Sequence, residues 1–159
     1  MAGDPAIEKV KFLLVALTRG VLQDDGVTPI NVFVDRSEDD PIREEERPAA
    51  AIRVVDVQLD PSLGMAETRH NCTLDVDFYE EALTFGGLSK RLSVMASDWN
   101  ALVAADRTLS GRLERFEIRS LTAELDAVPD LGCAIVTSEF SFITPRGDWT
   151  TIQGATGIF

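Results

Sequence analysis

The clearest pattern near the start of the chain is a helical repeat of apolar residues. Apolar side chains recur at steps of three, four, three and four residues, which places them on one face of an α-helix. They are Ile7, Val10, Leu14, Leu17 and Val21. Asp4 suits the N-cap and Pro5 the first helical position, and Gly20 marks the end. The pattern therefore predicts a helix over residues 5–21, packed on a sheet.

From residue 67 onward the pattern changes to strict alternation, which predicts a strand with one core face and one polar face. The core face holds Cys72, Leu74, Val76 and Phe78, and the polar face holds Thr73, Asp75, Asp77 and Tyr79. We therefore expect Asp75 and Asp77 on an open sheet surface or at a subunit boundary.

Four further segments have the composition of strands: residues 30–35, 49–59, 116–125 and 133–144. The second of these carries a partly continuous apolar run, which is typical of a strand that is buried on both faces. Several of these strands are about ten residues long, against a usual length of about five or six. Strands of this length favour a sheet that is built for assembly.

A second helical stripe lies between the alternating strand and the last two strands. Its apolar face comprises Leu92, Met95, Ala96, Trp99, Leu102 and Val103. We expect Trp99 in the core, and a loop over residues 84–89, where Gly86 and Gly87 are adjacent. Together the elements predict an α+β fold, with a mixed or antiparallel sheet of about five strands packed against two main helices. Residues 1–159 are expected to form one domain.

Residues 36–47 form a strongly acidic segment, which we call the acidic loop. It has almost no apolar content, and prolines lie within it and directly after it, so a solvated loop is expected. Two interpretations remain open: a flexible surface excursion, or a loop that faces a lumen or a basic partner. Its acidic residues are Glu38, Asp39, Asp40, Glu44, Glu45 and Glu46.

Residues 148–159, the C-terminal extension, carry Trp149, Ile152 and Phe159 among small polar residues. A terminal segment with this much apolar area either docks on its own chain or contributes to another subunit. We expect the second, so Trp149, Ile152 and Phe159 join Asp75 and Asp77 as candidate subunit contacts. On this interpretation, deleting the residues after Gly147 weakens assembly and spares the fold.

The overall charge narrows the range of partners. Fifteen basic and 27 acidic residues give a formal net charge of −12. Tight binding to nucleic acid depends on Lys and Arg that neutralise phosphates, so a protein that grips DNA is disfavoured. No apolar run approaches the ~20 residues that cross a bilayer, and the N-terminal segment lacks a basic leader. We therefore expect a soluble protein, made in a cytoplasm, with no membrane partner.

Catalytic and metal-binding patterns are weak. His70 and Cys72 share one side of a strand, and Cys133 could lie nearby, but a zinc site usually needs four clustered ligands. The sequence has no nucleophile elbow and no phosphate-binding loop. We therefore expect no enzyme activity, no metal and no cofactor. The alternative is a small α+β enzyme or ligand-binding domain that uses Asp75, Asp77 and His70.

The order of elements resembles the tail terminator proteins of long-tailed bacteriophages, the lambda-type minor tail protein family. The resemblance lies in the helix over residues 5–21 and in the run Pro48-Ala-Ala-Ala-Ile-Arg-Val-Val that leads into a strand. It continues through the strand Asn71-Cys-Thr-Leu-Asp-Val-Asp-Phe-Tyr-Glu. The helix that ends Trp99-Asn-Ala-Leu-Val-Ala-Ala-Asp then passes through Leu109-Ser-Gly to the closing strand pair.

This resemblance implies a virion structural protein. Its subunits would form a hexameric ring that caps the tail tube, stops tube polymerisation and joins the tail to the head connector. The implied partners are copies of itself, the tail tube protein and a neck protein. DNA would pass through the lumen without tight binding, and an acidic loop facing that lumen would keep it from adhering. The implied location is the head–tail junction, after assembly in the host cytoplasm. Another neck or tail-completion subunit is the close alternative.

Overall fold

The computed structural model describes residues 3–36, 40–61, 64, 66–81, 85–125, 132–154 and 157–159, with the backbone alone at residues 85, 124 and 125. Its helices are α1 (Ala6–Thr18), the short 3₁₀ helix η1 (Glu44–Glu46) and α2 (Phe85–Ala105). Its longer strands are β1 (Asn31–Val34), β2 (Ala49–Asp60), β3 (Glu67–Glu80), β4 (Arg115–Leu125) and β5 (Gly132–Pro145). Two short strands, β6 (Gln153–Gly154) and β7 (Gly157–Ile158), pair with each other near the C-terminus.

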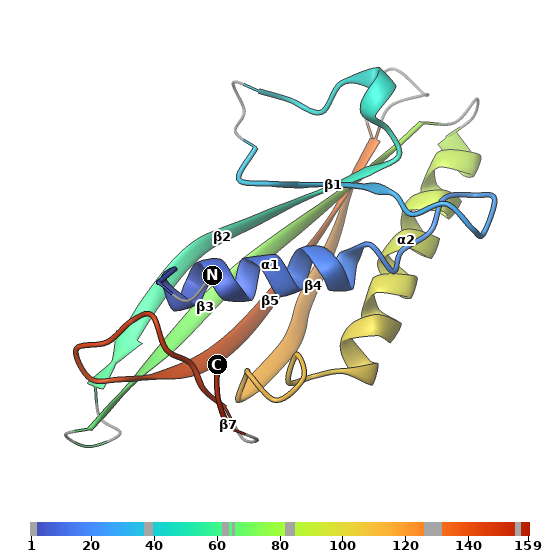
Figure 1. The fold of residues 1–159 in the computed structure, drawn as a ribbon. Coiled ribbons are helices and arrows are strands. Elements are labelled where there is room, and N and C mark those ends of the chain that lie inside the picture. The colour runs from blue at the N-terminus through green and yellow to red at the C-terminus, as the bar shows by residue number, and fades with distance from the viewer. Residues whose placement is uncertain are drawn as a thin grey trace.

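The main sheet has five strands in the order β1-β2-β3-β5-β4. β1 runs parallel to β2, and the other neighbouring strands are antiparallel, so the sheet is mixed. Helices α1 and α2 both pack on one face, which we call the helix face (Figure 1). We call the opposite side the open face. The predicted α+β class, with about five strands and two main helices, is confirmed.

The alternation in β3 and β5 places the two faces as the sequence predicts. Every even-numbered residue of β3 from Thr68 to Glu80 is buried. Four of these side chains belong to the main core: Cys72, Leu74, Val76 and Phe78. In β5, Ala134, Val136, Phe140 and Phe142 join the same core. Burying one large apolar side chain of this kind contributes about 1.5–3 kcal/mol. The two longest strands therefore anchor the sheet to both helices.

Trp99 lies at the centre of the helix layer and is fully buried, as predicted. Its ring centroid lies 5.7 Å from that of Phe116 and 6.4 Å from that of Phe78, both in edge-on contacts. Its Nε1–H donates to Thr18 Oγ1 at 3.1 Å, and Thr18 Oγ1 donates to the Leu14 carbonyl at 2.7 Å. The last turn of α1 is thus joined to α2 by a buried hydrogen-bond chain.

Two helix starts differ from the predictions. Pro5 is the N-cap of α1 rather than its first residue, and no side chain caps the helix, so Asp4 does not have the predicted role. Instead the Ala6 N–H donates to the Trp149 carbonyl at 2.6 Å.

The prediction of a loop over residues 84–89 is wrong from Phe85 onward, because α2 begins there. Leu88 is fully buried, and its packing outweighs the ~1 kcal/mol that each glycine costs in a helix.

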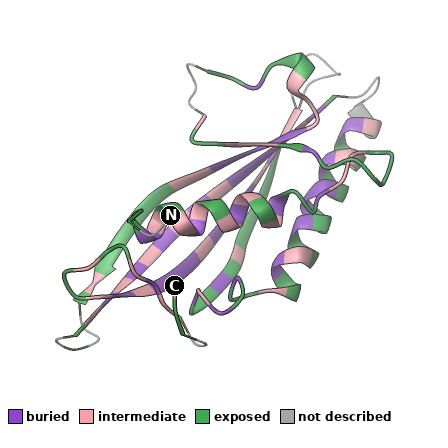
Figure 2. Ribbon diagram, viewed as in Figure 1, coloured by how far each residue is buried: buried purple, intermediate pink, exposed green. Residues whose placement is uncertain are grey.

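The acidic loop covers part of the open face. Ile42 is 5% exposed and packs with Ala49 and Ala51, while Phe33 and Tyr79 border this small second cluster. The first four residues of β2 are therefore buried on both faces, as predicted. The rest of β2 is mostly exposed (Figure 2), so the prediction of burial on both faces is wrong for residues 55–59.

Candidate assembly surface

The predicted pair Asp75 and Asp77 lies on the open face and is organised by Arg53. Arg53 Nη2 lies 2.8 Å from Asp77 Oδ2 and 3.9 Å from Asp75 Oδ2. Thr137 Oγ1, on the neighbouring strand, donates to Asp75 Oδ1 at 2.8 Å. The face assignment of the two aspartates agrees with the alternation in the sequence.

Asp77 does not lie on an accessible surface. It is only 4% exposed, because the acidic loop packs over this end of β3 and lines a cavity of about 490 Å³ with it. Burial raises the pKa of the Asp77 carboxyl, and Arg53 opposes that rise. The prediction of Asp77 as a subunit contact is therefore corrected: its carboxylate is held inside its own chain. Asp75 remains half-buried.

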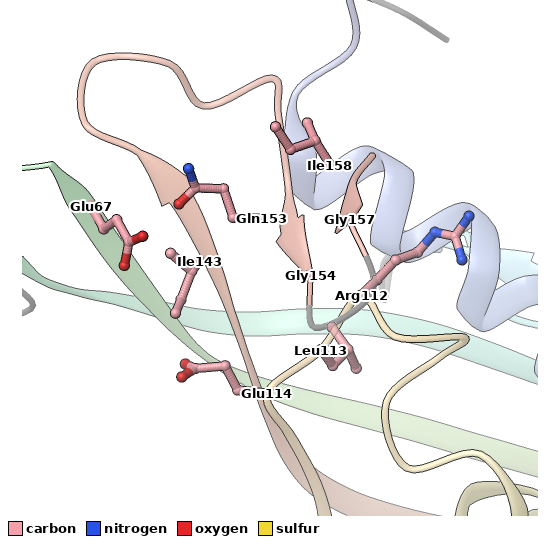
Figure 3. A pocket seen from close by; sticks show the side chains of 9 residues that line it. All are labelled: Glu67, Arg112, Leu113, Glu114, Ile143, Gln153, Gly154, Gly157 and Ile158. Atoms are coloured by element: carbon pink, nitrogen blue, oxygen red, sulfur yellow. The ribbon is translucent and has the colours of Figure 1, made fainter.

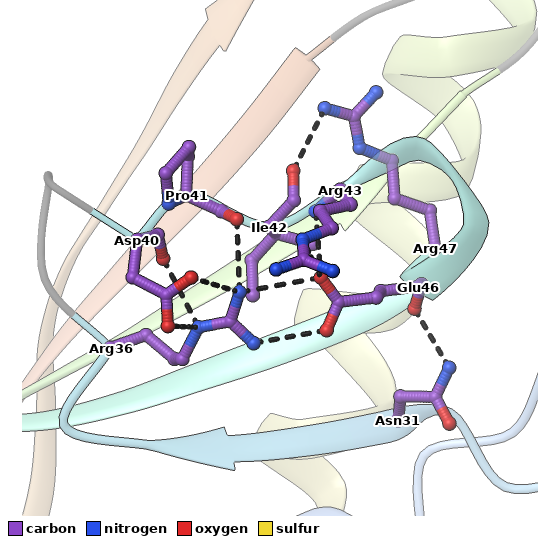
Figure 4. Close-up of polar contacts among 8 residues, drawn as sticks. All are labelled: Asn31, Arg36, Asp40, Pro41, Ile42, Arg43, Glu46 and Arg47. Atoms are coloured by element: carbon purple, nitrogen blue, oxygen red, sulfur yellow. Dashed lines mark hydrogen bonds and ion pairs between the residues drawn. The ribbon is translucent and has the colours of Figure 1, made fainter.

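The acidic loop is ordered around one cation, Arg36 (Figure 4). Arg36 Nη1 donates to Glu46 Oε2 at 2.9 Å, and Arg36 Nε lies 2.9 Å from Asp40 Oδ2. Arg36 Nη2 also donates to the Pro41 carbonyl at 2.9 Å. The Arg36 hydrogen bond lowers the pKa of Glu46. The described part of the loop is thus held together by ion pairs and hydrogen bonds, and its orientation toward a lumen or a partner stays a prediction.

The predicted acidic residues of this loop differ in their availability. Glu44 and Glu45 are exposed and make up most of η1, whereas Asp40 and Glu46 bind Arg36. Glu38 and Asp39 lie outside the described residues. Asp40 is also 56% exposed but is held by Arg36, so among the acids that the structure describes in this loop Glu44 and Glu45 are the best placed to face a lumen or a partner.

The three proposed zinc ligands do not converge. His70 and Cys72 point to the helix face, where His70 Nε2 lies 3.0 Å from Thr144 Oγ1 and the ring stacks on Phe142 at 4.6 Å. Cys133 lies beside Tyr79 and lines the cavity on the open face. Burial raises the pKa of Cys72 to about 12, so this thiol stays protonated at neutral pH. In the described part of the chain no group of three His, Cys, Asp or Glu side chains is placed to hold a metal ion.

His70 is also buried, at 5% exposure. Because His70 and the two aspartates occupy opposite faces of β3, they do not form one site. The alternative of an enzyme or ligand-binding domain that uses these three residues together lacks the geometry it needs.

The C-terminal extension docks on its own chain. Ile152 is fully buried in the main core and Phe159 packs against it, while the Arg112 guanidinium lies 4.1 Å from the centre of the Phe159 ring. Backbone hydrogen bonds of 2.8 and 2.9 Å join Ile152 and Phe159 in both directions. The prediction that Ile152 contacts another subunit is corrected, because its side chain fills the core of its own chain.

Of the three predicted contact residues of the extension, Trp149 is the most exposed. Its side chain is 53% exposed, and its ring meets the edge of His70 with centroids 5.5 Å apart. Beside the extension, a pocket of about 460 Å³ lies between Gln153 and the carboxylates of Glu67 and Glu114 (Figure 3). Its residues come from β3, β5, β6, β7 and the turn before β4, so it is a surface hollow that the docked extension helps to form.

Within the described residues the sheet has two unpaired edges, and the sequence did not indicate which strands form them. β4 is the outermost strand on one side. On the other side β1 pairs only with Ala49 to Ile52 of β2, so residues 53–60 pair with β3 alone and have no strand on their other side in the described part of the chain. Val55, Val57 and Leu59 are 51%, 43% and 45% exposed there. The signal in the sequence was the length of β2, which is three times that of β1.

Charged pairs cover much of the open face near these edges. Arg119 Nη2 lies 2.8 Å from Glu139 and 3.0 Å from Glu117, and Arg69 Nε lies 2.7 Å from Glu114. Such exposed pairs contribute about 0–1 kcal/mol each to stability. Their main effect is to keep this face polar.

No protein-family model matches the chain, and no curated protein matches it either. Within the described residues, neither helix is both long enough and apolar enough to span a membrane.

Proposed function

We propose that this protein is a subunit of a ring that caps the tail tube of a long-tailed bacteriophage, ends its polymerisation and joins the tail to the head connector. The observation that carries the proposal is the sheet with two different unpaired edges. The order of elements resembles that of phage tail terminators, and this resemblance is the reason for proposing a ring at the end of a tail tube.

The physical argument starts from the edges. An exposed strand edge with apolar side chains is a template for pairing with another chain. Two different edges on one molecule favour head-to-tail contacts, which form a closed ring when the rotation between copies permits it. A closed ring satisfies the edges without unlimited growth, which is what a cap needs.

The charge of the molecule supports a ring through which DNA passes. Each copy carries a formal net charge of −12, and the exposed Glu44 and Glu45 lie on η1, over the open face. A lumen lined by carboxylates repels the phosphates of passing DNA. We assign the open face and the acidic loop to the lumen side on this basis. A neck or tail-completion ring would use the same edges, and the position in the particle distinguishes these roles.

The proposal is tested by adding the purified protein to polymerising tail tube protein of the same phage. We expect the protein to bind tube ends, seen as a ring by negative-stain electron microscopy, and to stop elongation at substoichiometric amounts. Tube protein with buffer alone is the control. Tubes that lengthen normally, with a protein that stays monomeric by light scattering at every concentration, would contradict the proposal.

A further inference from the structure

The two unpaired edges of the sheet have complementary side chains. Val57 and Leu59 of β2 lie on the helix face, because they are paired with Cys72 and His70 of β3. Both side chains are exposed at the edge of the sheet. On the open face, Asp56 and Asp60 lie opposite Thr73 and Arg69. The β2 edge is therefore apolar on one side and acidic on the other.

On the open face of the β4 edge two arginines, Arg115 and Arg119, flank one acid, Glu117, so positive side chains outnumber negative ones there. Arg115 and Arg119 both reach Glu139 on the open face, and their side chains are 45% and 47% exposed. On the helix face, β4 carries Phe116 and Ile118, which belong to or border the main core. The two arginines are four residues apart, as are Asp56 and Asp60.

Strand direction also fits. β2 to β3, β3 to β5 and β5 to β4 are all antiparallel, so β4 runs opposite to β2. A second copy in the same orientation therefore brings its β2 antiparallel to β4, with helix face beside helix face. The sheet then continues across the contact, and each of the two strands carries a register irregularity near it, between Val54 and Asp56 in β2 and between Ile118 and Ser120 in β4.

One register places every complementary residue opposite its counterpart. It sets Asp60 against Arg115 and Asp56 against Arg119 on the open face. The same register sets Leu59 against Phe116 and Val57 against Ile118 on the helix face. Opposite charges and apolar pairs directly across two strands contribute about 0.2–1 kcal/mol each. Asp60 also lies 3.6 Å from Arg69 in its own chain, so it would stand between two guanidinium groups.

We propose that residues 53–60 of β2 in one copy pair antiparallel with β4 of the next copy in this register. The five-stranded sheets then join into one continuous sheet around the ring. The inference rests on the proposed function, because it states how the copies of the proposed ring meet. Since the two edges are different surfaces, every contact is head to tail and each copy uses both.

The test is a pair of cysteines placed across the contact, Asp56→Cys and Arg119→Cys in one chain. Residues directly opposite in an antiparallel pair have Cα atoms about 4.5–5.5 Å apart, which a disulfide spans. On oxidation with diamide we expect a ladder of covalent multimers on a denaturing gel, up to the size of the ring. Each single variant is expected to give no ladder.

The matched control is Val27→Cys combined with Arg119→Cys. Val27 is 79% exposed and lies in a turn outside the sheet, so this pair should not cross-link beyond the background from Cys72 and Cys133. Circular dichroism checks that each variant keeps the fold. All the replaced side chains are exposed, so the variants should fold.

The outcomes separate the two proposals. A ladder in the Asp56→Cys/Arg119→Cys protein alone supports the strand pairing. Ring-sized particles without a ladder would overturn the pairing and leave the proposed function standing. A protein that stays monomeric at all concentrations and in the presence of tail tubes would overturn both.

Discussion

His70 is held in a tight set of contacts on the helix face of the sheet. Its ring lies between Phe142, which it stacks on, and the edge of Trp149, and its Nε2 meets the Thr144 hydroxyl. Burial lowers the pKa of this imidazole below its ordinary value of 6.5. A proton on His70 must therefore be accommodated where water is scarce.

This arrangement makes stability depend on pH. The unfolded chain binds the proton at a higher pH than the folded chain does, so the free energy of unfolding falls as the pH decreases from about 7 through 6.5. The loss continues down to the folded pKa and then levels off. His70 is the single histidine in the sequence, so a variant at this position separates its share of the pH dependence from that of Asp77, whose carboxyl pKa is raised by burial.

We predict that replacing His70→Gln removes most of this dependence. Urea unfolding of both proteins between pH 7.5 and pH 5 provides the measurement. The unmodified protein should lose stability relative to the variant as the pH falls. A constant difference between the two proteins over the whole range would contradict the prediction.

At the scale of single residues, the sequence predicted on which face of a helix or strand a side chain lies better than it predicted which residues that side chain contacts. Trp99 in the core and the alternation around Asp75 followed directly from periodicity. The burial of His70 and Asp77 did not, because it depends on Trp149 and on the acidic loop, which are distant in sequence. Nothing local to Arg36 indicated that it would bind both Asp40 and Glu46.

The C-terminal extension behaves as an integral element of the fold. Ile152 fills the core, the Trp149 carbonyl accepts from the first N–H of α1, and the Thr150 carbonyl accepts from Lys9 Nζ at 2.5 Å. Removing the extension would expose the core under α1 and leave the start of that helix uncapped. We therefore expect deletion of the extension to destabilise the fold, which is the opposite of the expectation from the sequence.

We predict that Ile152→Ala lowers the free energy of unfolding by about 2–4 kcal/mol, since it leaves a cavity in a packed core. Ile158→Ala is the matched control, because Ile158 is 73% exposed and its truncation should cost less than about 0.5 kcal/mol. Urea unfolding of the three proteins gives the comparison. Equal stability of the two variants would show that the extension does not dock as described.

At the element scale, the strands and the second half of α2 could be predicted because their patterns repeat over many residues. The start of α2 could not, since Gly86 and Gly87 have the composition of a turn and only the packing of Leu88 decides for a helix. The split of β2 into a covered and an uncovered part depends on where β1 ends. That boundary is set by tertiary structure, and neither strand encodes it alone.

For the whole molecule, the distribution of free carboxylates matters more than the net charge. Arg36 forms ion pairs with both Asp40 and Glu46, whereas Glu44 and Glu45 are the exposed acids of η1. If the acidic loop lines the DNA path, these two residues act on passing DNA, and Glu46 acts only on the shape of the loop.

We predict that a phage carrying Glu44→Gln and Glu45→Gln assembles normally but ejects its DNA more slowly, by about a few-fold, because the lumen repels phosphate less. Glu8→Gln is the control, since Glu8 is an exposed acid on α1, on the other face of the sheet. Ejection is timed by the release of labelled DNA. Unchanged kinetics in the double variant would remove the acidic loop from the DNA path.

The shortness of β1 has a mechanical consequence for any neighbour that docks on β2. A strand sliding along this edge toward Ala49 would collide with Val34, because β1 already occupies that part of the edge. The end of β1 would thus limit how far one copy in the proposed ring can shift along β2 of the next copy. A longer β1 would cover the free edge of β2 completely. Without β1, successive copies could shift along β2 and assemble into an open helical filament instead of a closed ring.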